Sequence, residues 1–354
     1  MGTMQSRKIK INGREIGAGY PTYIIAEMSA NHGQDFDQAL RIIEAAKEAG
    51  ADAVKLQTYT ADTLTVDSDK EWFRIKGTAW QGRNLYELYQ EAATPWEWQP
   101  RLLEAAAGMG LACFSTPFDA TAVDFLEGIG VPAHKVASFE LVDLPLLKKI
   151  GGAGKPVIMS TGMAALAEID EAVATLRQAG SREVALLKCT SAYPASAAAM
   201  NLRTIPHLAE AFGVVAGLSD HTLGLAVPVA AVALGACIIE KHLTLSRAAG
   251  GPDSGFSLEP AEFKAMVKAV REAEQALGEV RYTLTEEEQA SRVFRRSLFV
   301  VRDVRAGEPF TSDNVRSIRP GHGLAPRYFE MVLGRRAVRN IEKGTPLAWE
   351  LLGE

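Results

Sequence analysis

Cysteines are few in this sequence, and long apolar runs are missing. The three cysteines, Cys113, Cys189 and Cys237, cannot all pair, and each lies in or beside a short apolar run. We therefore expect buried free thiols rather than disulfides or a zinc cluster. No apolar run approaches the roughly 20 residues that cross a bilayer, and the first residues lack the apolar stretch of a signal peptide. These absences argue against membrane partners and predict a location in the cytoplasm.

The excess of charge is also small, at −5 overall. Hydrophobic residues make up 47% and charged residues 23%, which is ordinary for a globular protein and gives no case for disorder. From Ser291 onward, however, 12 Lys and Arg stand against 7 Asp and Glu, and before it 26 stand against 36. This basic tail lacks the interleaved aromatics of a nucleic-acid platform. Docking onto an acidic body, or reaching toward an anionic ligand, is the simpler interpretation.

At 354 residues, the chain is long enough for one large domain and a small one. Up to about Gly278, short apolar runs alternate with amphipathic stretches, as in repeated β-α units. The candidate strands are 23–26, 53–56, 111–114, 135–137, 156–159, 184–187, 214–217 and 237–239, and the clearest helical patterns are 36–49, 98–107, 164–179 and 260–277. Eight strands with intervening helices predict an α/β fold, a (β/α)8 TIM barrel, over 1–280.

A charged linker at 281–290 is predicted to precede a second unit, 291–354, which contains an internal repeat. Segment 301–310 resembles segment 338–347, matching at Val, Arg, Gly and Pro. Repeated strand-turn units in about 60 residues predict a small, pseudo-symmetric, β-rich fold.

Polar side chains follow each of the eight apolar runs. In chain order they are Glu27; Lys55 and Gln57; Ser115 and Thr116; Ser138 and Glu140; Ser160 and Thr161; Lys188 and Thr190; Ser219, Asp220 and His221; and Glu240, Lys241 and His242. In such barrels the active site is built at the C-terminal ends of the strands. One polar end could be a satisfied core group, but eight that converge on one rim predict a functional pocket.

Two histidines, His221 and His242, close neighbouring predicted strands. Imidazole pairs at such ends suit a divalent transition metal, although each ring could instead bond a loop carbonyl. Two protein ligands are fewer than the usual three of a catalytic zinc site. Substrate oxygens and water would have to complete the shell, which favours an accessible site of the Mn²⁺ or Mg²⁺ kind.

Four lysines lie in or beside the strands, where an unpaired ammonium group is costly: Lys55, Lys135, Lys188 and Lys241. Some would pair with glutamates, and the surplus, with the nearby hydroxyls, suits a ligand that bears phosphate and carboxylate groups. Lys188 on the sixth strand is also where a Schiff-base aldolase could place its nucleophile. The hydroxyls and the histidine pair argue against that alternative, because imine chemistry requires no metal.

Ordered motifs along the chain resemble the sialic acid synthase family. They are 25–33 (IAEMSANHG), 55–58 (KLQT), 114–118 (FSTPF), 134–140 (HKVASFE), 160–163 (STGM), 189–194 (CTSAYP), 217–221 (GLSDH) and 239–242 (IEKH). The tail, with 319–323 (RPGHG), resembles the family's C-terminal antifreeze-like (SAF) domain. The resemblance spans nearly the whole chain and agrees with the predicted barrel and small domain.

Three further stretches resemble the branch of that family that makes pseudaminic acid: 57–63 (QTYTADT), 75–86 with 94–98 (IKGTAWQGRNLY, TPWEW) and 251–260 (GPDSGFSLEP). Ser191 also stands where the N-acetylneuraminate branch usually has Asn touching phosphoenolpyruvate. An apolar sugar pocket is expected for this branch, and its surface could come from Trp72, Trp80, Trp96, Trp98 and Phe256. N-acetylneuraminate and legionaminic acid synthases remain alternatives, as do a Schiff-base aldolase and a non-enzymatic carbohydrate-binding protein.

The resemblance implies a role for each matching residue. His221 and His242 would bind a divalent metal (Mn²⁺, Mg²⁺ or Co²⁺), which assists attack by C3 of phosphoenolpyruvate on an acetamido-sugar aldehyde, followed by C–O cleavage. Phosphoenolpyruvate would be held by Lys55, Thr116, Lys135, Ser138, Ser160, Ser191 and Ser219. The reacting centre and the sugar would be approached by Glu27, Glu140, Tyr193 and Asp253, with Gln57 and Asn84 as further substrate-binding residues. The family also implies a domain-swapped homodimer in which Arg319 and Phe294 line the opposite subunit's site.

Overall fold

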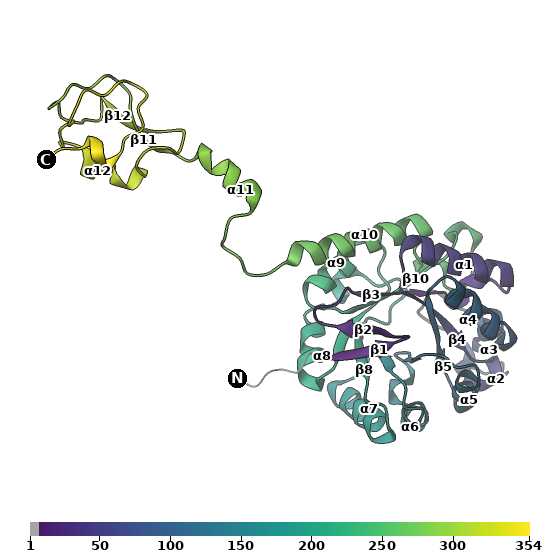
Figure 1. Ribbon diagram of the computed structural model, residues 1–354. Helices are drawn as coiled ribbons and strands as arrows, with labels where there is room; N and C mark the ends of the chain where they lie inside the picture. The colour runs from purple at the N-terminus through teal and green to yellow at the C-terminus, as the bar shows by residue number, and fades with distance from the viewer. Residues whose placement is uncertain (1–6) are drawn as a thin grey trace. The chain divides into compact units, whose positions relative to one another are not determined.

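The computed structural model describes residues 7–354, and the chain splits into two compact units after Gly278 (Figure 1). Among these residues, no helix is long and apolar enough to cross a membrane. The segment that we expected to be a linker overlaps a short helix, α11 (Glu286–Ser291), which begins at the capping residue Thr285.

The first unit is a closed barrel of eight parallel strands surrounded by helices, which confirms the predicted fold. The strands are β3 (Tyr23–Glu27), β4 (Ala53–Thr58), β5 (Ala112–Pro117), β6 (His134–Val136), β7 (Val157–Ser160), β8 (Val184–Cys189), β9 (Val215–Asp220) and β10 (Ile238–His242). Each pairs with the next in sequence, and β10 closes the barrel onto β3, with His242 opposite Glu27.

The helices that follow the strands are α1 (Phe36–Ala49), α4 (Gln99–Gly108), α5 (Ala120–Gly128), α6 (Leu144–Gly152), α7 (Leu166–Ala179), α8 (Thr204–Phe212), α9 (Ala226–Ala233) and α10 (Pro260–Leu277). The predicted bounds of α1 and α10 are correct, and those of α4 and α7 lie within two residues. The ends of helix α1 could be predicted from the sequence because both are marked by typical capping residues. Asp35 caps the first turn by accepting from two backbone N–H groups, and Gly50 ends the helix with φ +88°.

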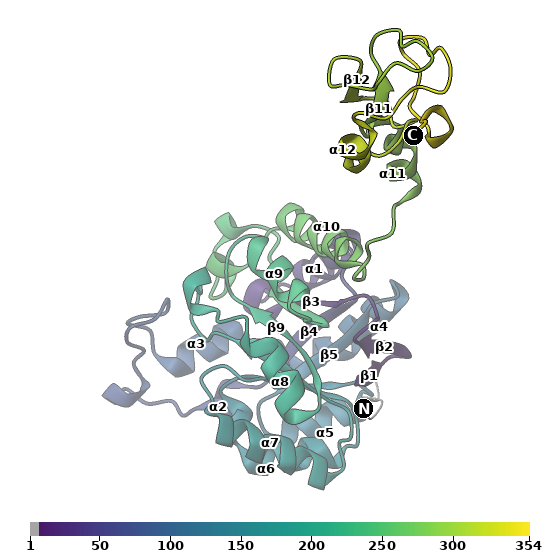
Figure 2. The same cartoon turned by 90° about the vertical axis from the view of Figure 1, so that its left-hand side faces the viewer.

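An insert between β4 and α4 was not predicted. It contains α2 (Ala61–Leu64) and α3 (Leu85–Ala92), and the loop between them extends away from the barrel (Figure 2). Both helices are short, so neither gives a long periodic pattern in the sequence. The insert follows β4 directly, which places it beside the carboxyl ends of the strands.

Side chains alternate along each strand between two cores. On β3, Ile24 packs outward with the helices, whereas Tyr23 and Ile25 fill the barrel interior. The same alternation on β10 sends Ile238 inward and Ile239 outward. Each polar side chain further along a strand also points either into the barrel or toward the helices. Only those that point into the barrel can reach a central site.

A hairpin closes the N-terminal end of the barrel. Strands β1 (Lys8–Ile11) and β2 (Arg14–Gly17) pair antiparallel, and their buried Ile9, Ile11 and Ile16 join the interior core at the start of the barrel strands. The core is thereby sealed at one end, and the carboxyl ends of the strands are left to form a cavity.

The second unit contains one antiparallel pair, β11 (Ser297–Val300) and β12 (Val315–Ile318), and helix α12 (Phe329–Val332). The two predicted repeats face each other, because Val304 and Ile341 exchange backbone hydrogen bonds of 2.9 and 2.8 Å. Their polar positions are reciprocal as well. Asp303 accepts from the backbone N–H of Lys343, and Asn340 accepts from that of Ala306, each at 2.8 Å. The expected pseudo-symmetry is therefore present in the fold.

Candidate active site

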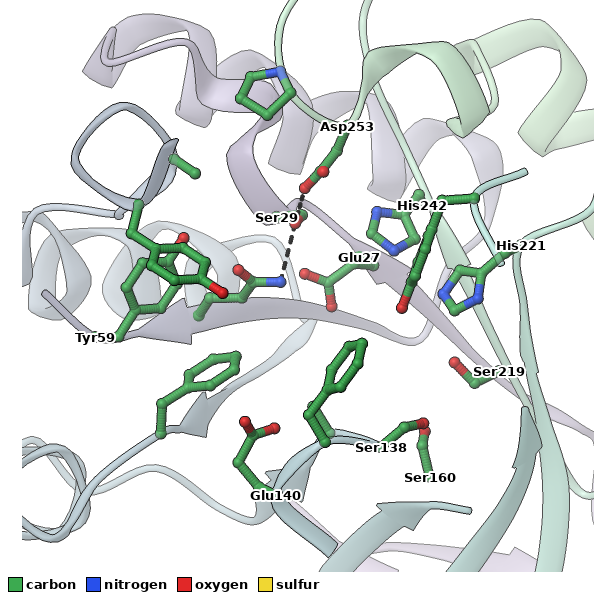
Figure 3. Close-up of a pocket in the computed structure, with 18 of the residues that line it drawn as sticks. Glu27, Ser29, Tyr59, Ser138, Glu140, Ser160, Ser219, His221, His242 and Asp253 are labelled. Atoms are coloured by element: carbon green, nitrogen blue, oxygen red, sulfur yellow. Dashed lines mark hydrogen bonds between the residues drawn. The ribbon is translucent and has the colours of Figure 1, made fainter. Parts of the chain in front are cut away.

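A cavity of about 470 Å³ opens at the carboxyl ends of the barrel strands (Figure 3). Most of the residues that we predicted for a site line it: Glu27, Lys55, Gln57, Lys135, Ser138, Glu140, Ser160, Tyr193, Ser219, His221, His242 and Asp253. They come from every part of the barrel sequence and meet only because the sheet closes.

Five predicted residues do not line this cavity. Asn84 caps helix α3 by accepting from the backbone N–H of Tyr86, and it donates to the carbonyl of Ser68. Thr116 is buried in the barrel wall, and Ser191 lies just past β8, 4.0 Å from the sulfur of Cys189. Phe294 and Arg319 belong to the second unit, where both side chains are exposed.

An ammonium group held between two carboxylates occupies the floor of the cavity. Lys55 Nζ lies 2.7 Å from Glu27 Oε2 and 3.0 Å from Glu240 Oε1, and all three side chains are buried. Register explains the meeting, since Lys55 is opposite Glu27 on β3. Burial lowers the pKa of Lys55 to about 8, although Glu240 opposes the shift. Electrostatic interactions between these charges and a bound ligand would become stronger when water is excluded from the site.

A second lysine and two hydroxyl groups extend the floor. Lys135 donates to Ser160 Oγ at 2.7 Å and lies 3.8 Å from Glu240 Oε1, to which Ser219 also donates at 3.4 Å. Burial raises the pKa of Glu240, but the ammonium groups of Lys135 and Lys55 outweigh burial and hold that pKa below its ordinary value. Glu240 is therefore ionised and central to the network.

Several buried polar atoms in the cavity wall lack a hydrogen-bond partner among residues 7–354: both carboxylate oxygens of Glu27, Glu240 Oε2, Glu140 Oε2 and His242 Nδ1. Lys55 lies at an ion-pair distance from Glu27 without hydrogen-bond geometry. Leaving such groups unsatisfied costs free energy, so native structures rarely do it without a ligand or water. Their clustering here marks the cavity as a binding site for polar groups.

The two histidines are placed to share one ion. Their ring centroids lie 5.3 Å apart, inclined by 55°, and His221 Nδ1 is 3.1 Å from the carbonyl of Thr190, which leaves Nε2 free. Imidazole nitrogens bind Zn²⁺ at about 2.0–2.1 Å, and the centroids of two rings on an ion of that kind lie roughly 5–6 Å apart. Burial holds the pKa of His242 well below its ordinary value, and the neutral ring is the form that binds metals.

In the described part of the chain, no group of three or more His, Cys, Asp or Glu side chains is arranged to hold a metal ion. An ion held by the histidine pair would have to take its remaining ligands from substrate and water, and this assignment stays a prediction. A closed structural zinc site would require more protein ligands than these two.

Aromatic rings form two walls of the cavity. Tyr193 packs on Trp80 and Phe256, with centroids 5.5 and 5.0 Å away, and Trp80 Nε1 donates to the carbonyl of Pro252 at 2.7 Å. The second wall is a cluster of Tyr59, Tyr89 and Phe118. Of the expected tryptophans, only Trp80 lines the cavity. Trp72 is 83% exposed, Trp96 packs on Phe125, and Trp98 packs on His32 and Phe36.

A polar chain crosses the rim between these walls. Gln57 donates to Ser29 Oγ at 2.9 Å, and Ser29 donates in turn to Asp253 (Figure 3). Burial raises the pKa of Asp253, and this hydrogen bond opposes the rise. The chain joins the β3, β4 and β10 loops, so it fixes the position of Asp253 relative to the barrel.

Lys188 is not available as a Schiff-base nucleophile in this cavity. Leu187 and Cys189 face the interior, so Lys188 faces outward, where its ammonium group donates to the carbonyl of Cys189 and to Thr190 Oγ1. The aldolase alternative required this side chain to reach the cavity, and strand alternation prevents it.

Several residues that line the cavity were not predicted as site residues, notably Ser29, Tyr59, Tyr89, Phe118 and Cys189. Cys189 was expected to be a buried thiol, and it is buried, but its sulfur lies 3.9 Å from His221 Nδ1 within the site. Ser29 and Cys189 fall inside the motifs that carried the resemblance, so that signal was present. Tyr59 and Phe118 also fall inside quoted motifs, 57–63 and 114–118, whereas Tyr89 lies outside them.

Comparison with known proteins supports a function for this cavity. The NeuB family matches residues 42–282, and the SAF domain matches residues 295–353. Pseudaminic acid synthase of Campylobacter jejuni is 47% identical over 92% of this chain and 95% of its own length, and that of Helicobacter pylori is 44% identical over 93% and 97%. The crystal structure of N-acetylneuraminic acid synthetase from Leptospira borgpetersenii in complex with citrate covers 81% of this chain and 95% of its own, with 33% identity and a TM-score of 0.72.

Proposed function

This chain belongs to the NeuB family, and from that premise we propose that its barrel condenses phosphoenolpyruvate with 2,4-diacetamido-2,4,6-trideoxy-L-altrose. The products are pseudaminic acid and phosphate, which makes the protein a transferase, with the cytoplasm as its expected location. The relatives named pseudaminic acid synthase match nearly the whole chain. The structural observation that carries the proposal is the pairing of a cationic, hydroxyl-lined floor with two imidazoles in one cavity.

Phosphoenolpyruvate suits the floor of the cavity. It carries a phosphate and a carboxylate, and charge-assisted hydrogen bonds to such groups are the strong ones. Lys135 with Ser160 and Ser219 offers an ammonium group and two hydroxyls within a few ångströms. Ser138 and Lys55 line the same surface. Thr116 and Ser191 stand outside the lining, and we retain them as phosphoenolpyruvate contacts on the resemblance alone.

His221 and His242 would hold the metal. Bound there, a divalent ion such as Mn²⁺, Mg²⁺ or Co²⁺ would polarise the aldehyde oxygen of the open-chain sugar as a Lewis acid. A sugar on the aromatic walls would lie beside the histidines, because Tyr193 packs against His221 with centroids 4.3 Å apart. Asp253 and Gln57, joined through Ser29, would bond the sugar's hydroxyl or acetamido groups.

The carboxylates then manage the charge that develops. C3 of phosphoenolpyruvate attacks the aldehyde carbon, and C2 becomes positively charged as the enol electrons form the new bond. Glu27 and Glu240 face this centre and stabilise it. Water adds at C2 and gives one proton to Glu27, which passes it to the alkoxide formed from the aldehyde oxygen. The C2–O bond to phosphate then breaks with its electron pair, the C2 hydroxyl gives its remaining proton to the departing phosphate, and C2 becomes a ketone.

A domain-swapped homodimer would complete the site. Exposed apolar side chains follow strands β6, β7 and β9 at the cavity end: Phe139, Val142, Met163, Leu166 and Leu223. The second unit is basic and exposes Phe294 and Arg319, whereas the barrel is acidic. We propose that the partner's second unit covers this rim and brings Arg319 and Phe294 to the sugar, since complementary charge steers such association.

The substrate assignment is tested by phosphate release with a panel of amino-sugar aldehydes. The expected kcat/KM is higher for the 2,4-diacetamido-trideoxy sugar than for N-acetylmannosamine, because the aromatic walls accept its methyl group and leave a hydroxymethyl unsatisfied. An apolar pocket alone discriminates a methyl-scale change by about 1–3 kcal/mol, so bonds to the second acetamido group must add to it. Equal kcat/KM values, or a preference for N-acetylmannosamine, would refute the branch assignment and leave the condensation chemistry intact.

A further inference from the structure

An ion pair is buried in the barrel wall directly behind the two histidines. The side chains of Asp220 and Lys241 are bonded to each other, and both are fully buried. The two residues are register partners at the ends of β9 and β10. Neither lines the cavity, because the alternate residues Ser219 and Glu240 face inward instead. The pair therefore lies between the barrel and its helices, where it cannot contact a substrate.

The ion pair is also hydrogen-bonded to Thr222, the residue that follows His221. Asp220 accepts from the backbone N–H of Thr222 at 2.9 Å and from its hydroxyl at 3.1 Å, and Lys241 donates to the carbonyl of Thr222. His221 is thus flanked by Asp220, a member of the ion pair, and by Thr222, which is bonded to both of its members. Because Lys241 immediately precedes His242, the same group fixes the backbone beside both rings.

Stability alone does not explain such a pair. Its surroundings in the outer core are apolar, with Leu218, Ile239 and Leu243 nearby on the same two strands. Removing two charges from water carries a large desolvation penalty, and apolar replacements of buried pairs are often as stable or more so. Precise placement of neighbouring groups is a role that an ion pair with fixed hydrogen-bond directions can fill and that apolar contacts cannot.

We propose that Asp220, Lys241 and Thr222 form a positioning clamp that sets the distance and orientation of His221 relative to His242 for metal binding. The clamp acts through the backbone, since outward and inward side chains alternate on the same strands. Groups that orient metal ligands from behind commonly change affinity by 10–100-fold when removed. This inference rests on the proposed function, because it takes the two histidines to be the metal ligands.

The test is Mn²⁺ affinity of the full-length, chelator-treated protein without substrates, followed by the electron paramagnetic resonance signal of free Mn²⁺. Asp220→Asn and Lys241→Met each remove one charge, and the double variant removes both, so it leaves no unpaired buried charge. All three are expected to bind Mn²⁺ about 10–100-fold more weakly than the wild type. Thr222→Val removes only one hydroxyl bond and is expected to show a smaller loss. Phosphate release is expected to recover at saturating Mn²⁺.

Asp52 supplies a matched control at the opposite end of the barrel. Its carboxylate pairs with Arg14 and Arg271 and accepts from the backbone N–H of Ile24. Asp52→Asn should lower thermal stability while leaving Mn²⁺ affinity within about twofold. Wild-type affinity in the folded double variant, or an equal loss in Asp52→Asn, would overturn the clamp. A wild-type protein that binds no Mn²⁺, or binds it equally after His221→Ala, would overturn the metal site itself.

Discussion

At the scale of single residues, Glu140 is a carboxyl group whose burial disfavours its charged form. It lines the cavity, and its Oε2 has no hydrogen-bond partner within the described residues. Burial raises the pKa of Glu140 from 4.5 to about 7, against a weaker opposing effect of Lys135. The folded state thus binds this proton more tightly than the unfolded chain. The resulting stability is fully present below pH 4.5 and is lost as the pH rises through 7.

Glu140→Gln should therefore change the pH dependence of stability. Between pH 5 and pH 8.5, the variant's free energy of unfolding relative to the wild type should rise by about 2–3 kcal/mol, because one pKa unit corresponds to 1.36 kcal/mol. Urea unfolding of the full-length protein, followed at both pH values, measures this difference. Glu104→Gln removes the same charge from an exposed position on α4 and should show no such trend. Parallel pH profiles for Glu140→Gln and the wild type would contradict the argument.

Residue directions were the hardest feature to obtain from the sequence. The motif match indicated the histidines, the serines and most of the carboxylates, and the structure brings them together. The motif match did not show that the side chain of Lys188 faces outward whereas that of Cys189 faces the cavity. Strands of a parallel barrel are buried on both faces, so their sequences lack the alternation of apolar and polar residues that would reveal direction.

At the scale of elements, the β1–β2 hairpin contributes buried side chains to the barrel core, and its contribution to stability can be measured. Ile11 is fully buried in the interior cluster at the N-terminal end of the barrel. Ile11→Ala should lower the free energy of unfolding by about 2–5 kcal/mol through lost burial and a residual cavity. The hairpin lies at the opposite end from the histidines, so kcat at a temperature where the variant is folded should not change.

Lys10→Ala provides the control on the same strand, because Lys10 is exposed and its removal should alter stability by less than about 0.5 kcal/mol. Chemical denaturation measures stability, and phosphate release measures kcat. A large loss of kcat in Ile11→Ala with little change in stability would contradict a purely structural role for the hairpin.

Strand existence was predictable from apolar runs, whereas strand ends were not. Strands β4, β9 and β10 continue through polar residues to Thr58, Asp220 and His242, because backbone pairing with the neighbouring strands continues to those positions. The hairpin was missed although its turn, Asn12 and Gly13, has positive φ at both residues and is the sequence most typical of a two-residue turn.

At the scale of the whole molecule, the proposed swap predicts what removal of the second unit does. A chain ending at Gln289 retains every barrel strand and the cavity lining. It should fold and bind Mn²⁺ but release little phosphate, because the partner's Arg319 and Phe294 are missing from the sugar site. Normal kcat/KM in the truncated protein would show that the second unit is not part of the site.

Mixing separates a swap from a merely stabilising tail. The truncated chain has an intact cavity, and full-length His221→Ala has an intact second unit. A mixed dimer then contains one complete site, so partial recovery of phosphate release is expected. A full-length chain carrying both His221→Ala and Arg319→Ala is the matched control and should restore less. Equal recovery with both full-length chains would contradict a role for Arg319.

Closure of the barrel also sets an order of events in time. The last strand, β10, pairs with the first, β3, across more than 200 residues of sequence, and contacts that distant form late because a long loop must be ordered first. Glu240 and His242 both arrive with β10, and without them Lys55 loses one carboxylate and His221 stands alone. During synthesis on the ribosome, the cavity therefore has neither the histidine pair nor the complete charge network until almost the entire barrel has emerged.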